Sequence, residues 1–388
     1  MEIYILDDLF RRETVVDRFE SLIWTEKYSA YGNFQLRMHS TFANRSLIKA
    51  GQRLAINNSR RVMTVENIVA TNDDNGESYF TASGRSLEAI LEDRTATSGV
   101  VDGTETLEWT ISDKTPGDQA RYIFATMIEN GYNSNNDAIP FYTSGSLYDP
   151  GTLIESQEID SLLIEPATVY NAIRKICELS DLGFRLYRGE DTSKLYFDVF
   201  IGNDLTSSQS SMPAVIVSPD MDNLTNTTEL TSIQQYKNVA YVYGKYGAKK
   251  VYIQGVTESI SGFERRVLLV IADDIEEPAG TALQALLEQR GKRELALQRN
   301  ISALDGELPK DNRYVYGVDY NLGDVIEMRN EDGVTNRMRI TEQIFVDDAV
   351  GERSYPTLEV ELFITPGSWA AWDYNVVWED AVGEWADA

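Results

Sequence analysis

The chain has 388 residues, a formal net charge of −27 and a sequence pI near 4.4. Hydrophobic residues make up 42% of it, which excludes a disordered chain and predicts about two to four domains with cores of their own. Nucleic-acid binding needs clustered Lys and Arg, so an encounter between this acidic chain and DNA is expected to be repulsive. The single cysteine, Cys177, excludes an internal disulfide and a cysteine-based metal cluster.

The sequence predicts neither a membrane span nor a secretory signal peptide. The sequence has no apolar run of about 18 residues, so no membrane span is expected. Residues 2–6 resemble a strand and are followed by Asp7 and Asp8, which is not the pattern of a secretory signal peptide.

Residues 1–90 predict an antiparallel barrel or sandwich of short strands separated by turn signals. The clearest element is a hairpin over Glu20–Met38, in which Leu22, Trp24 and Glu26 share one face of the first arm. One face of the second arm carries Phe34, Leu36 and Met38. Tyr31-Gly32-Asn33 is expected to supply the turn, with glycine at positive φ.

Residues 85–215 change to an α/β pattern. The periodicity predicts helices over 86–92, about 118–130, and from Pro166 to just before Gly183, followed by a hairpin over 184–200. On the third helix Cys177 falls on the apolar stripe, which predicts a buried, unreactive thiol. After a polar connector at 206–230, strands are expected at 231–244, 251–256 and 265–272, a helix at 281–299, and strands over 314–347 and 357–364.

An internal repeat relates residues 51–68 to 323–344. Each begins at a glycine, Gly51 or Gly323, and runs through a strand, a turn-rich gap and a second strand; Arg61 aligns with Arg337. The expected partner strands are 21–38 for the first copy and 232–244 for the second. Chance matching of common strand-turn-strand patterns is the alternative. Two similar units repeated by a three-fold axis would place six around a hole.

These patterns predict an α+β, mostly β fold. It would contain two tandem tube-like antiparallel β-barrels, an α/β module between them, and a strand-helix insertion in the second barrel. The expected domains are the first barrel at 1–90, the module at 91–220, the second barrel at 221–260 plus 314–366, the insertion at 261–313, and an acidic Trp-rich tail at 367–388.

Several segments resemble the tail-tip, or baseplate, hub protein family of long-tailed siphophages. The sequences are WTEKYSAYGNFQLR (24–37), FTASGRSLEAIL (80–91) and VYGVDYNLGDVIEM (315–328). The family carries Trp-(Thr/Ser)-Glu-x-Tyr followed by Gly-(Asn/Asp)-Phe, and Gly-x-Asp-Tyr-x-Leu-Gly-Asp. In element order the resemblance covers about residues 1–365, and the family is similar to the central hub of contractile phage baseplates.

The resemblance implies a non-enzymatic homotrimer that lines a DNA exit channel at the virion tail tip and is made in the host cytoplasm. It implies contacts with a distal tail ring protein, the tape-measure protein end, and tail-fibre or receptor-binding proteins, with transient passage of DNA. A negative channel wall would repel that DNA. A host-receptor or glycan-binding tail protein is the alternative, with the Tyr-rich loop 131–149 and the tail as its aromatic platform.

Candidate sites for chemistry are few. The only histidine, His39, is expected to be exposed in a turn, which argues against a multi-histidine zinc site. We expect no catalytic, cofactor-binding or metal-binding residues. The tail offers anchor candidates for a partner, because tryptophan is enriched at binding hot spots; they are Trp369, Trp372, Trp378 and Trp385. Packing of these side chains on the chain's own second barrel is the other expectation.

Overall fold

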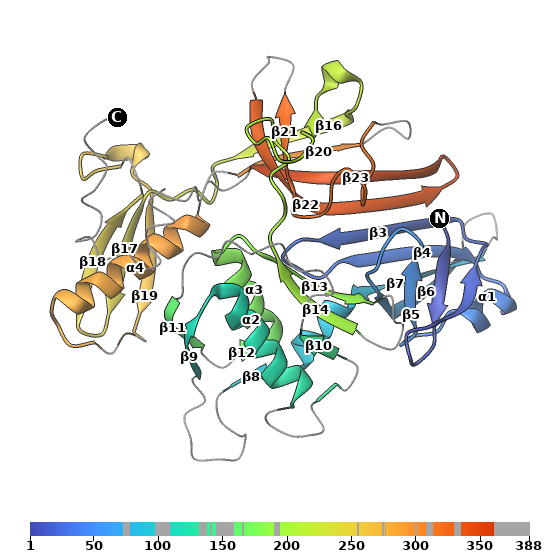
Figure 1. Cartoon of the computed structure of the whole chain (residues 1–388), viewed down its shortest axis with the longest axis horizontal. Helices are drawn as coiled ribbons and strands as arrows, with labels where there is room; N and C mark the ends of the chain where they lie inside the picture. Colours follow the sequence, from blue (N-terminus) through green and yellow to red (C-terminus); the bar gives the residue numbers. More distant parts are fainter. Residues whose placement is uncertain are drawn as a thin grey trace. The chain divides into compact units, whose positions relative to one another are not determined.

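The computed structural model (Figure 1) divides into two compact units, one from residues 1–228 and 304–361, the other from 229–303 and 362–388. It describes residues 1–72, 78–97, 109–131, 138–139, 142–144, 159–164, 167–189, 195–253, 256–273, 275, 277–298, 301–307, 313–329 and 335–360. Among these residues, the helices lack the length and apolarity that a bilayer crossing requires.

The first unit begins with a set of strands that we call the first β set. Its strands are β1 (Ile3–Leu6), β2 (Arg12–Val16), β3 (Ser21–Lys27), β4 (Asn33–His39), β5 (Arg53–Ile56), β6 (Met63–Asn72) and β7 (Ser78–Ser86). A short helix, α1 (Phe42–Leu47), follows β4. The core beneath these strands is built from the inward side of each, including Trp24, Phe34 and Leu36.

The predicted hairpin is confirmed as β3 and β4, with Trp24 opposite Phe34. Buried and exposed residues alternate along β4 as the pattern requires. The reason given for glycine in the turn is wrong, because Gly32 does not adopt a positive φ. A Cβ on Gly32 would lie 2.0 Å from the Thr25 carbonyl oxygen. Close backbone approach therefore requires this glycine.

The α/β module follows in the chain. Its helical elements are a 3₁₀ helix η1 (Leu87–Asp93), α2 (Pro116–Phe124) continued by a π-helical turn η2 (Ala125–Glu129), and α3 (Val169–Leu179). Its strands are β8 (Thr95–Ala96), β9 (Trp109–Lys114), β10 (Tyr142–Ser144), β11 (Ile159–Ile164), β12 (Ala167–Thr168), β13 (Gly183–Arg188) and β14 (Leu195–Phe200).

Local sequence explains the two main helices of this module. Each begins at a threonine cap: Thr115 Oγ1 accepts from Asp118 N at 3.3 Å, and Thr168 Oγ1 accepts from Asn171 N at 3.1 Å. Their apolar stripes meet in one core with β13 and β14. Cys177 is fully buried in that core, which confirms the prediction of an enclosed thiol.

A second β set completes the first unit, and the boundary with the second unit falls within its strands β16 and β20. It consists of β15 (Ile216–Val217), β16 (Thr225–Ser232), β20 (Ile301–Glu307), β21 (Val325–Arg329), β22 (Thr335–Asp348) and β23 (Gly351–Val360). A short 3₁₀ turn, η3 (Pro219–Met221), precedes β16. The two β sets join into one sheet in the order β16-β20-β23-β22-β3-β4-β7-β6-β5-β1-β2, with β21 on β22 and β15 on β21.

This topology confirms the mostly β, α+β class but not the two barrels. Within the described residues the strands form an open sheet, and no closed barrel is formed. The physical reason is the pairing of β22 with β3, which uses a strand edge to join the two sets. In Figure 1, β22 and β23 accordingly run beside β3 and β4.

The second unit has its own small core. Strands β18 (Gly247–Tyr252), β17 (Val239–Gly244) and β19 (Val267–Ala272) form its sheet, with β17 in the centre. The helix α4 (Thr281–Leu297) covers one face through Leu283, Leu287 and Leu295. A 3₁₀ turn, η4 (Gly262–Glu264), precedes β19. The expected helix at 281–299 is thus confirmed to within two residues.

The strand expected at 231–244 does not partner the second repeat copy. Its described strand β17 pairs with β18 and β19 instead. The strands that flank the second copy are β16 and β20. The main part of the second unit, residues 229–303, therefore begins within β16 and ends within β20, where the first copy has only the β3–β4 turn. This insertion takes in β17 and β18 as well as the predicted strand and helix.

The repeat itself is visible in the backbone. Gly51 (φ +85°) donates from its N–H to Val65 O, and Gly323 (φ +93°) donates to Ile340 O, both at 2.8 Å. A register shift follows each acceptor residue in the pairing with the next strand. The sequence alignment placed Thr341 opposite Val65 and was one residue out of register. The glycine hydrogen bonds correct the alignment, because they make Ile340 the equivalent of Val65.

Candidate functional site

The feature that unites the two β sets is the antiparallel pairing of β3 with β22, which we call the seam. It runs from Lys27 opposite Glu342 to Leu22 opposite Asp347. At one end Lys27 Nζ lies 2.8 Å from Glu342 Oε1. The pairing supplies a continuous backbone ladder between segments more than 300 residues apart in the chain.

Each seam strand contributes an aromatic side chain to the core of the other set. Phe345 of β22 is buried in the core of the first β set, where it packs edge-on against Tyr316 at 5.5 Å between ring centroids. Tyr28, the residue after β3, is buried in the core of the second β set. The exchange means that neither core is complete without the other strand.

Tyr28 also binds the α/β module through its backbone and its hydroxyl group. Its N–H donates to Thr341 O at 2.9 Å, and its carbonyl accepts from Phe184 N at 3.0 Å. The hydroxyl donates to Asp181 O at 3.0 Å and lies 3.3 Å from Phe200 O. Burial raises the pKa of this phenol, so it stays a neutral donor. Three parts of the first unit therefore meet at Tyr28.

Two glycines make room for the Tyr28 ring. A Cβ on Gly183 would lie 2.2 Å from Tyr28 Cε2, and a Cβ on Gly323 would lie 2.4 Å from it. Gly323 is the last glycine of the Gly-x-Asp-Tyr-x-Leu-Gly-Asp signature, and Tyr28 closes the Trp-Thr-Glu-x-Tyr signature. The two sequence signatures are thus in direct contact.

An arginine closes the same junction from the side of β22. Arg339 Nη1 donates to Gly323 O at 2.6 Å, and Arg339 Nη2 lies 2.7 Å from Asp181 Oδ2. The guanidinium carbon lies 5.4 Å from the centroid of the Tyr28 ring, within the range of a cation–π contact. This buried charge is therefore held by a carbonyl, a carboxylate and an aromatic face.

A second polar contact joins the signatures at Glu26. This carboxylate is buried and accepts hydrogen bonds from Trp24 Nε1 at 3.2 Å and from Ser59 Oγ. Tyr316 OH lies 3.4 Å from its other oxygen. Burial, together with the neighbouring Glu26 charge, raises the pKa of Tyr316 well above its ordinary value. Glu26 is therefore a structural acceptor whose oxygens are occupied by donors.

A buried ion pair fixes the first β set to the α/β module. Arg61 and Glu88 face each other with almost no solvent exposure. Arg61 Nη2 also donates to Lys27 O at 2.9 Å, and Glu88 Oε1 accepts from Leu186 N at 2.9 Å. Removing one partner would leave a buried charge, so this pair specifies how the two parts pack.

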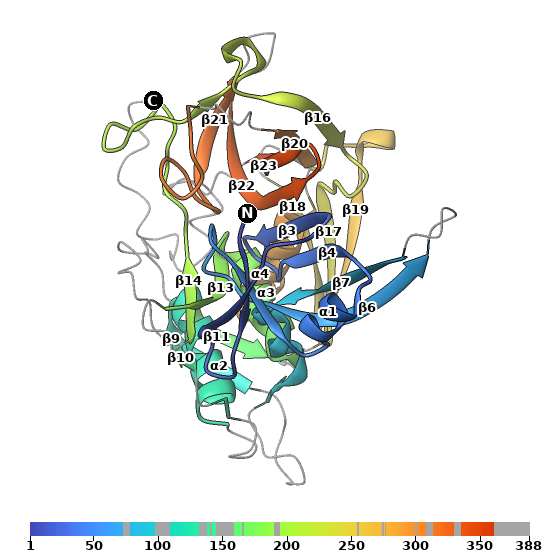
Figure 2. The same cartoon turned by 90° about the vertical axis from the view of Figure 1, so that its right-hand side faces the viewer.

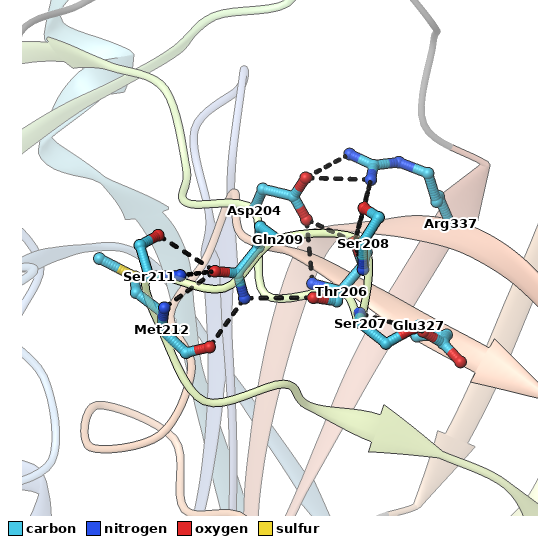
Figure 3. Close-up of polar contacts among 9 residues, drawn as sticks. All are labelled: Asp204, Thr206, Ser207, Ser208, Gln209, Ser211, Met212, Glu327 and Arg337. Carbon is cyan, nitrogen blue, oxygen red and sulfur yellow. Dashed lines mark hydrogen bonds and ion pairs between the residues drawn. The ribbon is translucent and has the colours of Figure 1, made fainter.

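Figure 3 shows a polar cluster where the connector after β14 crosses β21 and β22. Arg337 Nη1 and Nη2 both lie 3.0 Å from Asp204 Oδ2, and Nη1 also lies 3.0 Å from Thr206 Oγ1. Glu327 accepts from Ser207 N at 3.1 Å. The Ser/Thr-rich connector is thus an ordered part of the second β set at this point.

The pKa of Asp204 is set by two opposing effects. Partial burial disfavours its ionised form, but hydrogen bonds from Thr206 and the ion pair with Arg337 outweigh that effect and lower the pKa. The cluster therefore has a structural role: it holds the connector against β21 and β22.

The residues singled out from the sequence do not form a reactive site. Trp369, Trp372, Trp378 and Trp385 lie outside the described residues, as does most of the loop 131–149. His39 ends β4, is half-exposed, stacks on Tyr79 and lies 2.8 Å from Glu20 Oε1. Among the residues that the structure describes, no group of three or more His, Cys, Asp and Glu side chains is placed to hold a metal ion.

Sequence reasoning did not identify Tyr28, Arg339 or Gly323 as a junction. A signal for Tyr28 was present, because Trp24, Glu26 and Tyr28 alternate along one face of the same segment. The partners of that face come from segments far away in the chain, and period-two alternation does not specify them.

Comparison with known proteins identifies the family. The family described as "Siphovirus ReqiPepy6 Gp37-like protein" matches residues 2–358. The chain belongs to this siphovirus family. Among curated proteins none matches the sequence. The match confirms the resemblance to siphophage proteins that the two signatures indicated, over nearly the whole chain.

Solved structures show that the fold occurs in tail proteins. The tail protein from Neisseria meningitidis MC58 is 13% identical, with a TM-score of 0.58 over 93% of this chain and 96% of that one. The 43 kDa tail protein of prophage MuSo2 from Shewanella oneidensis is 15% identical, with a TM-score of 0.55 over 92% and 97%. At these identities the comparison establishes a common fold.

The two repeat glycines provide a matched test of the junction. We expect Gly51→Ala to lower the free energy of unfolding by about 1–3 kcal/mol, because alanine at positive φ is strained. Gly323→Ala should cost about 1–3 kcal/mol more, because the added methyl overpacks Tyr28. Gly51 has nothing within 4 Å of its built Cβ, so it controls for strain alone. Equal losses in denaturant unfolding would contradict the junction.

The Asp204–Arg337 pair predicts a pH dependence. Because the folded-state pKa of Asp204 is lowered, its stabilisation is present above the unfolded pKa of about 4 and is lost as pH falls through the folded value. Arg337→Gln should therefore reduce stability by at most about 1 kcal/mol at pH 7, since the pair is partly exposed. The difference between the two proteins should shrink below pH 4 in denaturant titrations. A pH-independent difference would contradict this account.

Proposed function

We propose that this chain is the structural hub of a siphophage tail tip. In this proposal three copies form a ring that joins the end of the tail tube to host-attachment proteins and lines the DNA exit channel. The observation that carries it is the presence of two β sets with the same strand order, joined edge to edge by the seam. Family membership and the tail-protein fold support it.

The repeat gives the proposal its geometry. A homotrimer has closed three-fold symmetry, and two similar β sets per chain would present six similar units to a neighbouring ring. Each β set would then form one tube-like part of the ring wall. The junction at Tyr28 supports such a role, because it fixes the two sets and the α/β module against one another.

Net charge supports a channel that DNA crosses without being held. The chain carries a formal charge of −27, which would repel a phosphate backbone passing beside it. The proposal is therefore of a structural, non-enzymatic protein in the virion tail. Its proposed neighbours are a distal tail ring protein, the end of the tape-measure protein, and tail-fibre or receptor-binding proteins.

The mass and shape of the purified particle test the hub. We expect a mass of three chains by light scattering and a three-fold ring with a central opening by electron microscopy. A compact monomer at every accessible concentration would contradict the proposal. Binding of the isolated protein to host glycans would instead support a receptor-binding tail protein.

We further propose that the C-terminal tail docks a neighbouring subunit or the next tail-tip protein. The four tryptophans, Trp369, Trp372, Trp378 and Trp385, would supply large apolar anchors between acidic residues. Truncation after residue 366 should then reduce trimer formation or incorporation into tails. A variant with the tail intact and Phe42→Ser, at an exposed site, is the control. Unchanged assembly of the truncated chain would contradict tail docking.

A further inference from the structure

The two β sets are equivalent strand by strand. In space the first runs β3-β4-β7-β6-β5 and the second runs β16-β20-β23-β22-β21. In the chain both occur in the same sequence, so β3 corresponds to β16, β4 to β20, β7 to β23, β6 to β22 and β5 to β21. The paired glycine hydrogen bonds and the bulges fix this correspondence, with Val65 equivalent to Ile340.

The equivalence exposes a difference between β22 and β6. Beyond its bulge β22 uses its outer edge, residues 342–347, to pair with β3. The equivalent part of β6 is Asn67–Asn72, which we call the β6 edge. Within the described residues it pairs with β7 on one side and with no strand on the other. Figure 2 shows this part of β6 extending outward together with β7.

The side chains of the β6 edge are more exposed than their equivalents on β22, because no second strand of the described structure covers them. On β22 the seam leaves Gln343, Phe345 and Val346 buried. On the β6 edge every residue is exposed, including Ile68 at 40% and Val69 at 56%. An uncharged strand with exposed apolar side chains and a free edge is a surface that natural proteins ordinarily protect.

The β6 edge lacks two of the usual protections of an edge strand, charged side chains and proline. Its sequence, Asn-Ile-Val-Ala-Thr-Asn, contains no charged residue and no proline. The strand at the other end of this side of the sheet, β2, is also an edge, but it carries Arg12 and Glu13. Charges of that kind discourage strand addition, so the two edges differ in the way expected of a blocked edge and a receptive one.

The strand that fits the β6 edge is at the opposite end of the same sheet. β16 is terminal in the strand order, and it corresponds to β3, the strand that β22 binds within the chain. Each chain thus has one receptive edge of the β22 type and one strand of the β3 type. These two strand types already pair once inside every chain.

We propose that the β6 edge of one copy binds β16 of a second copy by strand addition, as β22 binds β3 at the seam. This inference rests on the proposed trimeric hub and assigns its subunit contact. The interface is heterologous, with different strands from the two copies, and such a contact closes a ring when the rotation between neighbouring copies is 120° for three copies. Backbone hydrogen bonds would provide most of its affinity, and alternate side chains its register.

The seam also predicts the register. Because Val65 is equivalent to Ile340, Val69 is equivalent to Ile344, which lies opposite Thr25. Thr25-Glu26 with Ser29 matches Thr228-Glu229 with Ser232 in β16. Val69 of one copy is therefore expected to lie opposite Thr228 of the next.

Cysteine cross-linking of the full-length protein tests whether the β6 edge of one copy pairs with β16 of another. In Val69→Cys/Thr228→Cys, mild oxidation should give covalent species of up to three chains on a non-reducing gel, and these species should disappear after reduction. Val15→Cys/Thr228→Cys is the control, because Val15 is similarly exposed, at 48%, on the charged β2 edge. Absence of the cross-link, or equal cross-linking in the control, would overturn the inference. The buried Cys177 is not expected to contribute.

A lysine scan separates failure of this contact from failure of the hub. Val69→Lys should weaken association about tenfold or more, because it places a charge in the ladder, while Val15→Lys should leave it unchanged. Both residues are exposed, so the melting temperature of the monomer should not change. A trimer that neither cross-links nor responds to Val69→Lys overturns the edge assignment and leaves the hub intact. A wild-type monomer overturns both.

Discussion

The exchange of aromatic residues across the seam is the constraint on which the first unit depends. Tyr28 leaves the first β set to fill the core of the second, and Phe345 does the reverse. Buried aromatics contribute large apolar areas, so separating the strands would open both cores at once. The backbone ladder gives the seam its register, and the exchanged side chains make it cooperative.

The junction also explains why two distant glycines are needed. The Tyr28 ring occupies the positions where side chains of Gly183 and Gly323 would stand. Gly323 meets a second demand, because its φ of +93° is open to few other residues. The same residue thus serves the turn before β21 and the packing of β3. Arg339 then holds the Gly323 carbonyl and Asp181, which binds the α/β module into the arrangement.

A repeat with one edge used and the other exposed is informative about assembly. Within the chain, the edge of β22 is covered by β3 and its side chains are buried. The equivalent edge of β6 pairs with no second strand in the described structure, and its side chains, Ile68 and Val69 among them, are exposed. Insertion of the main part of the second unit between β16 and β20 leaves the strand order of the second set unchanged.

Sequence patterns anticipated much of the local structure. Alternation in residues 34–38 predicted the buried face of β4, and the helical stripe ending at Cys177 predicted α3 and its enclosed thiol. Both predictions depend on near neighbours in the chain, which set the period of burial. The signatures around Trp24 and Gly323 likewise pointed to the family that the chain belongs to.

Sequence patterns did not predict which segments pack against those faces. The segment 231–244 reads as a strand in isolation, and only the folded chain assigns β17 to the second unit and β16 and β20 to the repeat. The sequence by itself determined the strongly periodic elements, such as β4 and α3, because burial repeats with the period of each element. It placed most of β16 in a polar connector and did not predict β20. Tertiary structure decided which strand edges meet, because bulges shift register and long-range packing at Tyr28 selects among edges that are locally equivalent.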